Sequence, residues 1–479
     1  MLYLRGGFMH LPDYKEARKR DIRPYHRVEF QFDDKVKNKY QGKTFYLKTY
    51  GCQMNEHDSE NIEALLEFLG FTKVDDYTAA DLVLLNTCSI RENAHNKAFG
   101  MLGRLKHLKQ EKKDLIVGLC GCMAQEASVV DTILQDYRWV NFVFGTHNMY
   151  QLPEIIDKAI EENKQQIEVF SREGDLVEGV PVRRVNDYKA YVNIIYGCNK
   201  FCTYCIVPYT RGRERSRLKE DVLKEVQELV RDGYKEVTLL GQNVNAYGKD
   251  IYDDYTMANL LEDVAKMGIP RIRFTTSHPW DFTDEMIDVI AKYDNIMPSV
   301  HLPVQSGSSR ILKLMGRRYT KESYLELFHK IKDRVPRVSI STDIIVGFPG
   351  ETEEDFLETL DLVRECQYDN AFTFIFSKRE GTPACRLADP VPLKEKEERL
   401  QRLNEVVNHY FLENNKRLVG CELEVLVEGI SDKKHMYYGY SDTNKLINFS
   451  SEKELKPGDI VMVKIVDAKT WSLDGEMVE

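Results

Sequence analysis

The sequence predicts an α/β protein built from two series of strands and helices, followed by a small β-barrel. In residues 43–160, apolar stretches typical of strands alternate with segments of helical spacing, and the alternation resumes over residues 184–415. Strands that alternate with helices form parallel sheets whose faces the helices cover. After Gly420, apolar residues recur in places at every second position, which indicates short strands without intervening helices.

Four strands and three helices are expected in the N-terminal α/β domain, residues 43–160. The strands are predicted at residues 45–50, 81–86, 114–119 and 141–144, and the helices at residues 58–69, 93–108 and 151–162. Residues 163–187 contain Gly174, Gly179 and Pro181 and look like a polar connection. Residues 1–42 carry ten Lys or Arg and few periodic apolar positions, which is typical of an N-terminal arm.

The central domain, residues 184–415, shows six strand–helix units. Strands are predicted at residues 191–195, 236–240, 271–275, 299–302, 339–346 and 371–376, with helices between them, for example at 221–232 and 324–334. Six such units predict a partial (β/α)6 barrel of the TIM type, whose functional residues lie at the C-terminal strand ends. A charged amphipathic helix at residues 395–417 leads to residues 416–479, which are predicted to form a small antiparallel β-barrel.

The composition excludes several classes of protein. Of the 479 residues, 42% are hydrophobic, which is enough for several packed cores and argues against a disordered chain. No apolar run approaches the roughly 20 residues that a membrane-spanning helix needs. The net charge of −10 argues against a broad basic face for nucleic acid, although a local basic patch fits this charge. We therefore expect a cytoplasmic protein with no membrane attachment.

Three cysteines form the most specific motif in the chain, Cys198-Asn-Lys-Phe-Cys202-Thr-Tyr-Cys205. In a long cytosolic chain, cysteines are more typical of metal ligands or catalytic groups than of disulfides. Three thiolates in one loop after a strand can bind three irons of a [4Fe–4S] cluster and leave the fourth iron open. The alternative, a structural zinc site, needs a fourth ligand, and no suitable Cys or His lies nearby in the sequence.

Three further cysteines each follow a predicted strand of the N-terminal domain. They are Cys52 in Tyr-Gly-Cys, Cys88 in Asn-Thr-Cys and Cys122 in Cys-Gly-Cys-Met. Because the carboxyl ends of parallel strands lie at one edge of a sheet, these thiols are predicted to meet at one site. The alternative is that all three are buried structural cysteines, since cysteine is often found in cores. Cys120 also lies at a strand end; we interpret it as structural, and a functional role stays open.

The spacing C-x3-C-x2-C, placed after the first of six strand–helix units, resembles that of the radical S-adenosylmethionine superfamily. The resemblance implies that S-adenosylmethionine binds the open iron and is cleaved to a 5′-deoxyadenosyl radical, with the three cysteines as the catalytic cluster ligands. Polar residues at later strand ends would then contact this cofactor. The candidates are Tyr204, Gln242, Asn243, Ser277, His278, Gln305 and Asp343. For His278, as for His301, the alternative is a hydrogen-bonded core histidine.

The second cysteine triad and the C-terminal barrel narrow the resemblance to the methylthiotransferases. In that family an N-terminal α/β domain holds a second, auxiliary [4Fe–4S] cluster, here implied for Cys52, Cys88 and Cys122. A small C-terminal TRAM domain binds RNA in these enzymes. Residues 416–479 carry a net charge of −3, which does not itself predict RNA binding. Candidates for stacking and phosphate contacts are Tyr437, Tyr438, Tyr440 and Lys433-Lys434, and for the tyrosines a core or surface role is the alternative.

The segment after Cys205 contains four arginines within seven residues, Arg211-Gly-Arg-Glu-Arg-Ser-Arg217. Planar guanidinium groups bind phosphate through two donors at once and stack on bases. We therefore predict that Arg211, Arg213 and Arg215 contact substrate RNA or the surroundings of the cluster. The alternative is a set of surface arginines paired with nearby acidic residues.

The residues around these motifs, including Thr49-Tyr-Gly-Cys-Gln-Met-Asn-Glu56 and Gly241-Gln-Asn-Val-Asn-Ala-Tyr-Gly248, are similar to those of bacterial tRNA methylthiotransferases. The resemblance implies methylthiolation of C2 of N6-(dimethylallyl)adenosine next to the tRNA anticodon, with two molecules of S-adenosylmethionine per turnover. The expected partners are this tRNA and an electron donor such as a flavodoxin or ferredoxin, and we expect a monomer. The alternatives are a methylthiotransferase for threonylcarbamoyl-adenosine tRNA or a ribosomal-protein aspartate, and a non-catalytic iron–sulfur RNA-binding protein.

Overall fold

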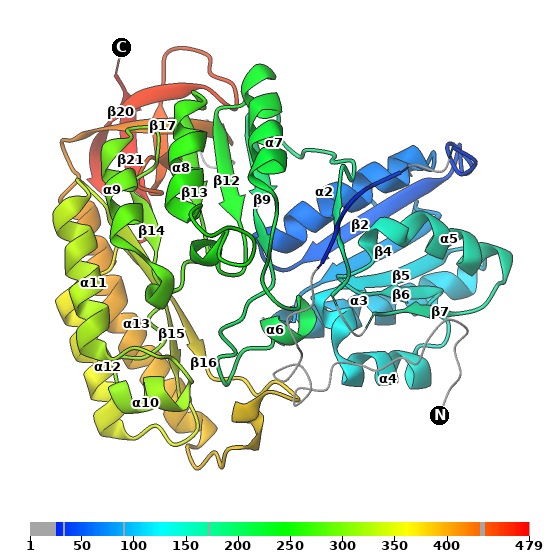
Figure 1. Cartoon of the computed structure of the whole chain (residues 1–479), viewed down its shortest axis with the longest axis horizontal. Helices are drawn as coiled ribbons and strands as arrows, with labels where there is room; N and C mark the ends of the chain where they lie inside the picture. Colours follow the sequence, from blue (N-terminus) through cyan, green and yellow to red (C-terminus); the bar gives the residue numbers. More distant parts are fainter. Residues whose placement is uncertain (1–24, 32–33, 90–91, 171–172, 432–435, 479) are drawn as a thin grey trace. The chain divides into compact units, whose positions relative to one another are not determined.

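The computed structural model describes residues 25–31, 34–89, 92–170, 173–431 and 436–478, and Figure 1 labels its helices and strands. The chain divides into two units, each assembled from separate stretches of sequence. The first comprises the described residues of Met1–Val185, Ile195–Arg217 and Arg379–Cys385, and the second those of Asn186–Ile194, Leu218–Lys378 and Arg386–Glu479. The cysteine motif after residue 195 therefore belongs to the same unit as the N-terminal sheet. The domain limits at residues 43–160, 184–415 and 416–479 stay predictions.

The first unit contains a parallel six-stranded sheet with the strand order β3-β2-β4-β5-β6-β7. Its strands are β2 (Thr44–Tyr50), β3 (Thr72–Lys73), β4 (Leu82–Thr87), β5 (Ile116–Gly121), β6 (Phe142–Phe144) and β7 (Gln166–Glu168). The helices between them are α2 (Gln53–Phe68), α3 (Glu92–Glu111), α4 (Ala127–Asp136) and α5 (Leu152–Glu161). Every neighbouring pair of strands is parallel, which confirms the predicted fold of this domain.

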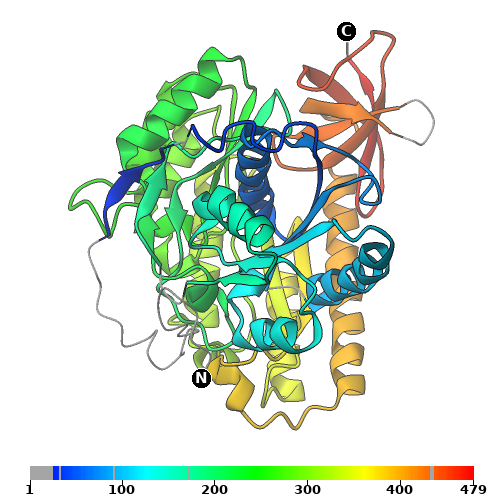
Figure 2. The ribbon, with the colours of Figure 1, turned by 90° about the vertical axis from the view of Figure 1, so that its right-hand side faces the viewer.

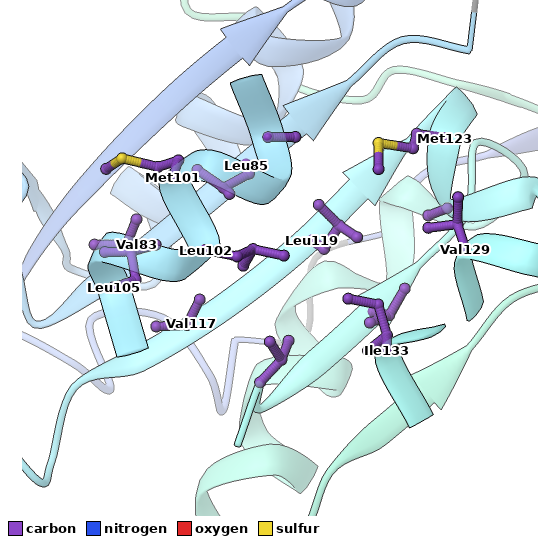
Figure 3. Close-up of a cluster of buried hydrophobic side chains, with 14 of the residues drawn as sticks. Val83, Leu85, Met101, Leu102, Leu105, Val117, Leu119, Met123, Val129 and Ile133 are labelled. Atoms are coloured by element: carbon purple, nitrogen blue, oxygen red, sulfur yellow. The ribbon is translucent and has the colours of Figure 1, made fainter. Parts of the chain in front are cut away.

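Strand β4 explains why helices cover both faces of this sheet. All of its residues are buried, and its apolar side chains alternate between two hydrophobic clusters. Val83 and Leu85 pack with Leu102 of α3 in the cluster drawn in Figure 3. Leu82 and Leu84 point the other way and pack in a cluster that includes residues of α2 and α5. A strand buried on both faces is typical of a parallel sheet between helices.

Two short strands show that the prediction of a mere polar connection at residues 163–187 is wrong. Strand β7 adds a sixth strand to the sheet, and β8 (Leu176–Glu178) pairs in parallel with β1 (Arg27–Glu29). The latter strand belongs to the predicted N-terminal arm, of which residues 1–24 and 32–33 lie outside the described residues. Strands this short contain too few residues for an apolar period to be recognised in the sequence.

The second unit contains the six predicted parallel strands as two three-stranded sheets, β13-β12-β9 and β14-β15-β16. The strands are β9 (Lys189–Asn193), β12 (Glu236–Leu240), β13 (Arg271–Phe274), β14 (Ser299–His301), β15 (Ser339–Val346) and β16 (Asn370–Ile375). The main helices after them are α7 (Lys219–Arg231), α8 (Met257–Lys266), α9 (Asp284–Lys292), α11 (Lys321–Arg334), α12 (Glu353–Cys366) and α13 (Leu393–Lys416). The parallel pairing and the alternation with helices confirm the predicted α/β class of this domain.

The chain ends in a closed five-stranded barrel that follows the long helix α13 (Figure 2). Its strands are β17 (Glu422–Ile430), β18 (Tyr437–Ser441), β19 (Leu446–Ser450), β20 (Ile460–Ala468) and β21 (Leu473–Met477). The predicted small barrel is confirmed. Its neighbouring strands are antiparallel, as predicted, except that β19 and β21 run parallel. None of the helices in the described ranges is both long enough and apolar enough to cross a membrane.

Candidate functional site

Three neighbouring strands of the first sheet lead into Cys52, Cys88 and Cys122. The pairing register places the last residues of β2, β4 and β5 side by side. Cys52 directly precedes α2, Cys88 directly follows β4, and Cys122 begins the short 3-10 helix η1 (Cys122–Gln125) after β5. The sheet therefore brings the three predicted cysteines to one edge.

The thiols of these three cysteines lie close enough to affect one another. A hydrogen bond from the Cys88 thiol lowers the pKa of Cys52 to about 6, although burial opposes this. Burial raises the pKa of Cys122; Arg211 counteracts this effect, and the Cys52 thiol adds to it. The thiolate is the form of cysteine that binds a metal, so the lowered pKa of Cys52 favours metal binding.

A buried hydrogen-bond network holds the loops that carry these cysteines. Asn55, in the first turn of α2, donates to Asn86 Oδ1 at 3.1 Å and to the Thr87 carbonyl at 3.2 Å. Asn86 donates in return to the Asn55 carbonyl and to Ser59 Oγ, each at 2.9 Å. Thr87 Oγ1 donates to the carbonyl of Cys120 at 2.6 Å. Buried polar groups that satisfy one another in this way fix the relative positions of the three strand ends.

Cys120 lies on the face of β5 that packs into the protein core. It belongs to the hydrophobic cluster that also contains Leu84 and Phe142. Burial raises the pKa of its thiol well above the ordinary value, which disfavours the thiolate. These features support the structural interpretation of Cys120.

The guanidinium group of Arg211 lies against the edge that carries the cysteines. Arg211 is only 5% exposed, its Nε donates to Cys122 Sγ at 3.0 Å, and its Nη2 donates to Asp58 Oδ2 at 2.6 Å. This position agrees with the second part of the prediction for Arg211, a role in the surroundings of a cluster. A contact between Arg211 and RNA stays a prediction.

The other two predicted arginines occupy different surroundings. Arg215 is buried and donates to the Gly174 carbonyl at 2.7 Å, and its contact with RNA stays a prediction. Arg213 is partly buried, and its guanidinium lies over the ring of Phe201 at 5.4 Å from the ring centroid. A contact between Arg213 and RNA stays a prediction.

The loop of Cys198, Cys202 and Cys205 is folded so that its thiols interact. Burial raises the pKa of Cys198 well above its ordinary value, and Glu214 and the Cys205 and Cys202 thiols act in the same direction. The Cys205 N–H donates to the Cys202 carbonyl at 3.0 Å. The Cys198 N–H donates to the Gly212 carbonyl at 3.1 Å, which ties the start of the loop to the arginine segment.

The remaining candidates belong to the second unit and, except for Asp343, follow the ends of its strands, whereas Tyr204 belongs to the cysteine loop of the first unit. Gln242 and Asn243 follow β12, Ser277 and His278 follow β13, Gln305 follows β14, and Asp343 lies within β15. The Asn243 amide donates to Asp281 Oδ2 at 2.7 Å. In the part of the chain that the structure describes, Ser277 Oγ and Asn245 Oδ1 are buried atoms without a hydrogen-bond partner. Because buried polar atoms are nearly always paired, both are candidates to bind a ligand.

Backbone contacts bring Gln305 and Asp343 together. The Gln305 N–H donates to the Asp343 carbonyl at 2.8 Å, and Gln305 adopts a left-handed conformation with φ of 73°. His301 Nε2 lies 3.3 Å from Asp343 Oδ2, and His301 Nδ1 lies 2.9 Å from Ser341 Oγ. Both ring nitrogens of His301 therefore have protein partners, which supports its interpretation as a hydrogen-bonded core histidine.

Tyr319 connects the loops that follow β13 and β14. Its hydroxyl donates to the Val304 carbonyl at 3.0 Å, and its ring centroid lies 6.0 Å from that of His278. His278 Nδ1 accepts a hydrogen bond from the Trp280 N–H at 3.3 Å. One ring nitrogen of His278 is thus used inside the protein, while its role toward a cofactor stays a prediction.

In the C-terminal barrel, the three candidate tyrosines are all partly exposed and differ in their contacts. Tyr437 packs against Phe449, with ring centroids 6.0 Å apart, and its hydroxyl accepts a hydrogen bond from the Leu455 N–H at 3.1 Å. These contacts favour a core role for Tyr437. Tyr438 and Tyr440 are partly exposed on the same strand. Lys433 and Lys434 lie outside the described residues.

The donor chemistry of the two cysteine triads fits iron–sulfur clusters. No disulfide joins the ten cysteines, all of which lie in the described ranges. Within those ranges, no three Cys, His, Asp or Glu side chains are placed to hold one metal ion. The thiolates of a [4Fe–4S] cube bind different irons, so they need not converge on a single ion as zinc ligands do.

Three known families match successive parts of the chain. Residues 44–145 match Uncharacterized protein family UPF0004, residues 192–363 match the Radical SAM superfamily, and residues 416–478 match the TRAM domain. The tRNA-2-methylthio-N(6)-dimethylallyladenosine synthase of Staphylococcus aureus strain JH9 is 54% identical over 473 residues, which cover 98% of this chain and 91% of the relative. The chain belongs to this synthase family. The synthase of strain Newman is 53% identical over the same length.

Membership of the synthase family confirms the predicted family resemblance and the predicted class of enzyme, a radical S-adenosylmethionine tRNA methylthiotransferase. The superfamily match implies one [4Fe–4S] cluster and S-adenosylmethionine. Among solved structures, the radical S-adenosylmethionine methyltransferase TsrM from Kitasatospora setae, with cobalamin and a [4Fe–4S] cluster bound, has a similar fold. The TM-score is 0.52 at 15% identity, over 72% of this chain and 77% of that chain. A second TsrM structure, with tryptophan substrate and an analogue of the cofactor bound, gives a TM-score of 0.51 at 15% identity, over 82% of this chain and 79% of that chain.

Sequence reasoning misses several residues that the structure places at the candidate site. Asp58, which pairs with Arg211, lies in a helix whose sequence shows no motif for this contact. Asn245 lies within the Gly241–Gly248 segment that the sequence indicates, but the lack of a hydrogen-bond partner for its Oδ1 is a tertiary feature that the sequence does not show. Tyr319 has no local signal, because its partners come from two other loops.

Proposed function

We propose that this chain transfers a methylthio group to C2 of N6-(dimethylallyl)adenosine next to the tRNA anticodon, using two molecules of S-adenosylmethionine per turnover. The observation that carries the proposal is the 54% identity to a synthase with this product in its name, over 98% of the chain. The match includes both cysteine triads and the C-terminal barrel. The adenine C2–H bond is strong and not acidic, so acid–base groups alone would not activate it, and a cofactor supplies the difficult chemistry.

Each cysteine triad is proposed to hold one [4Fe–4S] cluster. The ligands of the radical cluster are Cys198, Cys202 and Cys205, and those of the auxiliary cluster are Cys52, Cys88 and Cys122. When bound, the radical cluster supplies the electron that cleaves S-adenosylmethionine to the 5′-deoxyadenosyl radical. The grouping of the thiols supports both assignments. The protein buries Cys88, Cys122, Cys198 and Cys202, whereas Cys52 and Cys205 are partly exposed. Burial of most of the thiols limits the access of water to the reacting groups.

The strand-end residues of the second unit are proposed to bind S-adenosylmethionine together with Tyr204. The proposed contacts are Gln242, Asn243, Ser277, His278, Gln305 and Asp343. The unpaired Ser277 Oγ supports this role, and the unpaired Asn245 Oδ1 adds a further candidate. A ligand with hydroxyl and amino groups, such as S-adenosylmethionine, would satisfy both oxygens.

The partners of the reaction follow from the substrate and the chemistry. We assign RNA contacts to Arg213 and to the C-terminal barrel, with Tyr438 and Tyr440 as candidates for stacking on bases. Reduction of the clusters needs an electron donor, for which we propose a flavodoxin or ferredoxin. The chain is proposed to act as a monomer in the cytoplasm, where tRNA is modified.

Mass spectrometry of nucleosides tests this function. The reconstituted chain is incubated anaerobically with S-adenosylmethionine, a reductant and tRNA that carries N6-(dimethylallyl)adenosine. The proposal predicts a methylthio group on that nucleoside and release of 5′-deoxyadenosine. Matched tRNAs with unmodified adenosine or threonylcarbamoyl-adenosine should stay unchanged. Methylthiolation of the threonylcarbamoyl nucleoside instead would overturn the substrate assignment, and the absence of 5′-deoxyadenosine with intact, reducible clusters would overturn the radical mechanism.

A further inference from the structure

Arg211 is held beside Cys122 by the segment that precedes it in the sequence. The one-turn helix α6 (Val207–Thr210) begins two residues after Cys205 and ends immediately before Arg211. The Arg211 N–H donates to the Val207 carbonyl at 2.8 Å, and Thr146 Oγ1 donates to the Thr210 carbonyl at 2.5 Å. The segment that leaves the Cys198–Cys205 loop therefore leads directly to the edge that carries Cys122.

Two hydrogen-bond donors on one edge of the Arg211 guanidinium have different acceptors, a carboxylate oxygen and a sulfur. Nη2 and Nε lie on the same edge, which in a two-pronged ion pair would bind both oxygens of one carboxylate. Here Nη2 donates to Asp58 Oδ2, whereas Nε donates to Cys122 Sγ. Arg217, six residues later, shows the usual arrangement, since its Nε and Nη2 both donate to Glu178 at 2.7 Å.

Because Arg211 is buried, its hydrogen bonds to Asp58 and Cys122 are strong. A buried charge is costly unless it is paired, and Asp58 provides the pairing carboxylate. Hydrogen bonds from charged donors are stronger than those from neutral donors. They become stronger still in the protein interior, where the dielectric constant is low. A cationic donor at the sulfur of a cluster ligand stabilises negative charge there, and the charge of a cluster becomes more negative on reduction.

We propose that Arg211 is a positioning residue of the auxiliary cluster, which holds the Cys122 thiolate and raises the reduction potential of that cluster. The inference rests on the proposed function, because it requires the auxiliary cluster. Within the first unit, Arg211 also connects the two cysteine loops. It belongs to the segment that follows the radical-cluster loop and donates a hydrogen bond to Cys122 of the auxiliary-cluster loop. Asp58 sets the strength of this effect by neutralising part of the guanidinium charge.

Two substitutions with opposite expected effects test the inference. They are made in a full-length chain with Cys198, Cys202 and Cys205 replaced by alanine, so that only the auxiliary cluster is present. The midpoint potential is then measured by redox titration followed by electron paramagnetic resonance. Arg211→Met removes the positive donor and is expected to shift the potential to more negative values. Asp58→Asn removes the opposing negative charge and is expected to shift it to more positive values.

Arg217→Met is the matched control, because Arg217 is another buried, paired arginine of the same segment but donates to Glu178 instead of to a cysteine. It is expected to leave the potential unchanged. Arg211→Lys keeps the charge without the planar fork and should shift the potential less than Arg211→Met. If Arg211→Met prevents cluster assembly, the Asp58→Asn variant provides the test. A shift of its midpoint potential to more positive values then supports the inference.

The outcomes separate this inference from the proposed function. An auxiliary cluster whose potential is the same in the parent, Arg211→Met and Asp58→Asn proteins would overturn the role of Arg211 alone. Shifts of the same sign in both variants would also overturn it, since they would indicate a general disturbance of the fold. If the parent protein binds no iron after reconstitution, the auxiliary cluster itself is refuted, and the proposed function and this inference fall together.

Discussion

Asn55 and Asn86 exchange hydrogen bonds at the sheet edge that carries Cys52, Cys88 and Cys122. The Asn55 amide donates to Asn86 Oδ1 at 3.1 Å, and the Asn86 amide donates to the Asn55 carbonyl at 2.9 Å. Both side chains are buried, so neither has water as an alternative partner. The exchange joins the helix that begins after Cys52 to the strand that ends before Cys88.

Replacement of Asn86 by alanine should therefore loosen the auxiliary site. Asn86→Ala removes the two hydrogen bonds that Asn86 exchanges with Asn55 and the one that it donates to Ser59, which is expected to lower the free energy of unfolding by about 2 kcal/mol. It should also lower the iron content after reconstitution from about eight toward about four per chain. Urea denaturation and iron analysis measure the two effects. Gln110→Ala, at an exposed position of α3, is the control, and equal values for both variants would contradict the role of the network.

Gly197, which precedes Cys198, should tolerate no side chain. Its φ is 78°, and a Cβ atom would lie 2.0 Å from the Arg213 carbonyl oxygen. Gly233 has a similar φ of 87° but open space around it, so Gly233→Ala should cost only about 1 kcal/mol of backbone strain. Gly197→Ala is expected to cost more and to reduce assembly of the radical cluster. Thermal unfolding and the yield of 5′-deoxyadenosine compare the two variants, and equal behaviour would show that the contact with Arg213 is unimportant.

The attachment of the C-terminal barrel to the second unit's sheet should depend strongly on Arg271, the fully buried one of two arginines of β13 that donate to the Ser441 carbonyl. Arg271 of β13 is fully buried, forms an ion pair with Glu236 at 3.0 Å and donates to the Ser441 carbonyl at 2.8 Å. Arg271→Met removes one positive partner of the buried Glu236 carboxylate and should lower the free energy of unfolding by about 3 kcal/mol. Arg337→Met removes an ion pair between an exposed arginine and the buried Asp442, which keeps a hydrogen bond from the Thr443 N–H, and should change stability by less than about 1 kcal/mol. Calorimetry with limited proteolysis distinguishes these outcomes, and an unchanged barrel in Arg271→Met would contradict the anchoring role.

The loop after β14 should be held by an ionised Asp355. Burial opposes ionisation, but hydrogen bonds from Arg310, Ser308 and Thr352 hold the pKa of Asp355 well below its usual range. A carboxylate with a lowered folded-state pKa stabilises the fold above its unfolded-state pKa of about 4, and this stabilisation is lost as the pH falls further. Asp355→Asn should therefore be less stable by about 1 kcal/mol, with a constant difference from pH 8 to pH 5.5 that narrows below about pH 4. Urea titrations of the iron-free parent and Asp355→Asn proteins measure this difference in the free energy of unfolding at each pH. If the difference disappeared between pH 8 and pH 5.5, a group other than Asp355 would be responsible.

Much of the fold was accessible to prediction because its signals are local. The apolar run at residues 81–86 predicts a strand buried on both faces, and β4 (Leu82–Thr87) is such a strand. Strands β7 and β8 are too short to show a period, and helix α4 (Ala127–Asp136) was not predicted. The parallel pairing of β19 with β21 was hidden, because alternation of apolar residues indicates a strand but not its direction.

The candidate site shows the same division between local and tertiary information. The positions of Cys52, Cys88 and Cys122 directly after predicted strands indicate that the three cysteines meet. The reason is that the carboxyl ends of parallel strands lie at the same edge of a sheet. The run of arginines after Cys205 marks an important segment, but the sequence cannot show which arginine is buried. The partner of Arg211 is Asp58, 153 residues away in the chain, and only the packing of α2 against this segment brings the two together.

The most direct test of the two-cluster account compares the two cysteine triads in separate variants. With about eight irons expected in the parent chain, each triple alanine variant should retain about four. The variant of Cys52, Cys88 and Cys122 should still release 5′-deoxyadenosine but form no methylthio product, because radical formation needs only the other cluster. The variant of Cys198, Cys202 and Cys205 should form neither product. A parent chain with about four irons, or methylthio product from the first variant, would contradict the account.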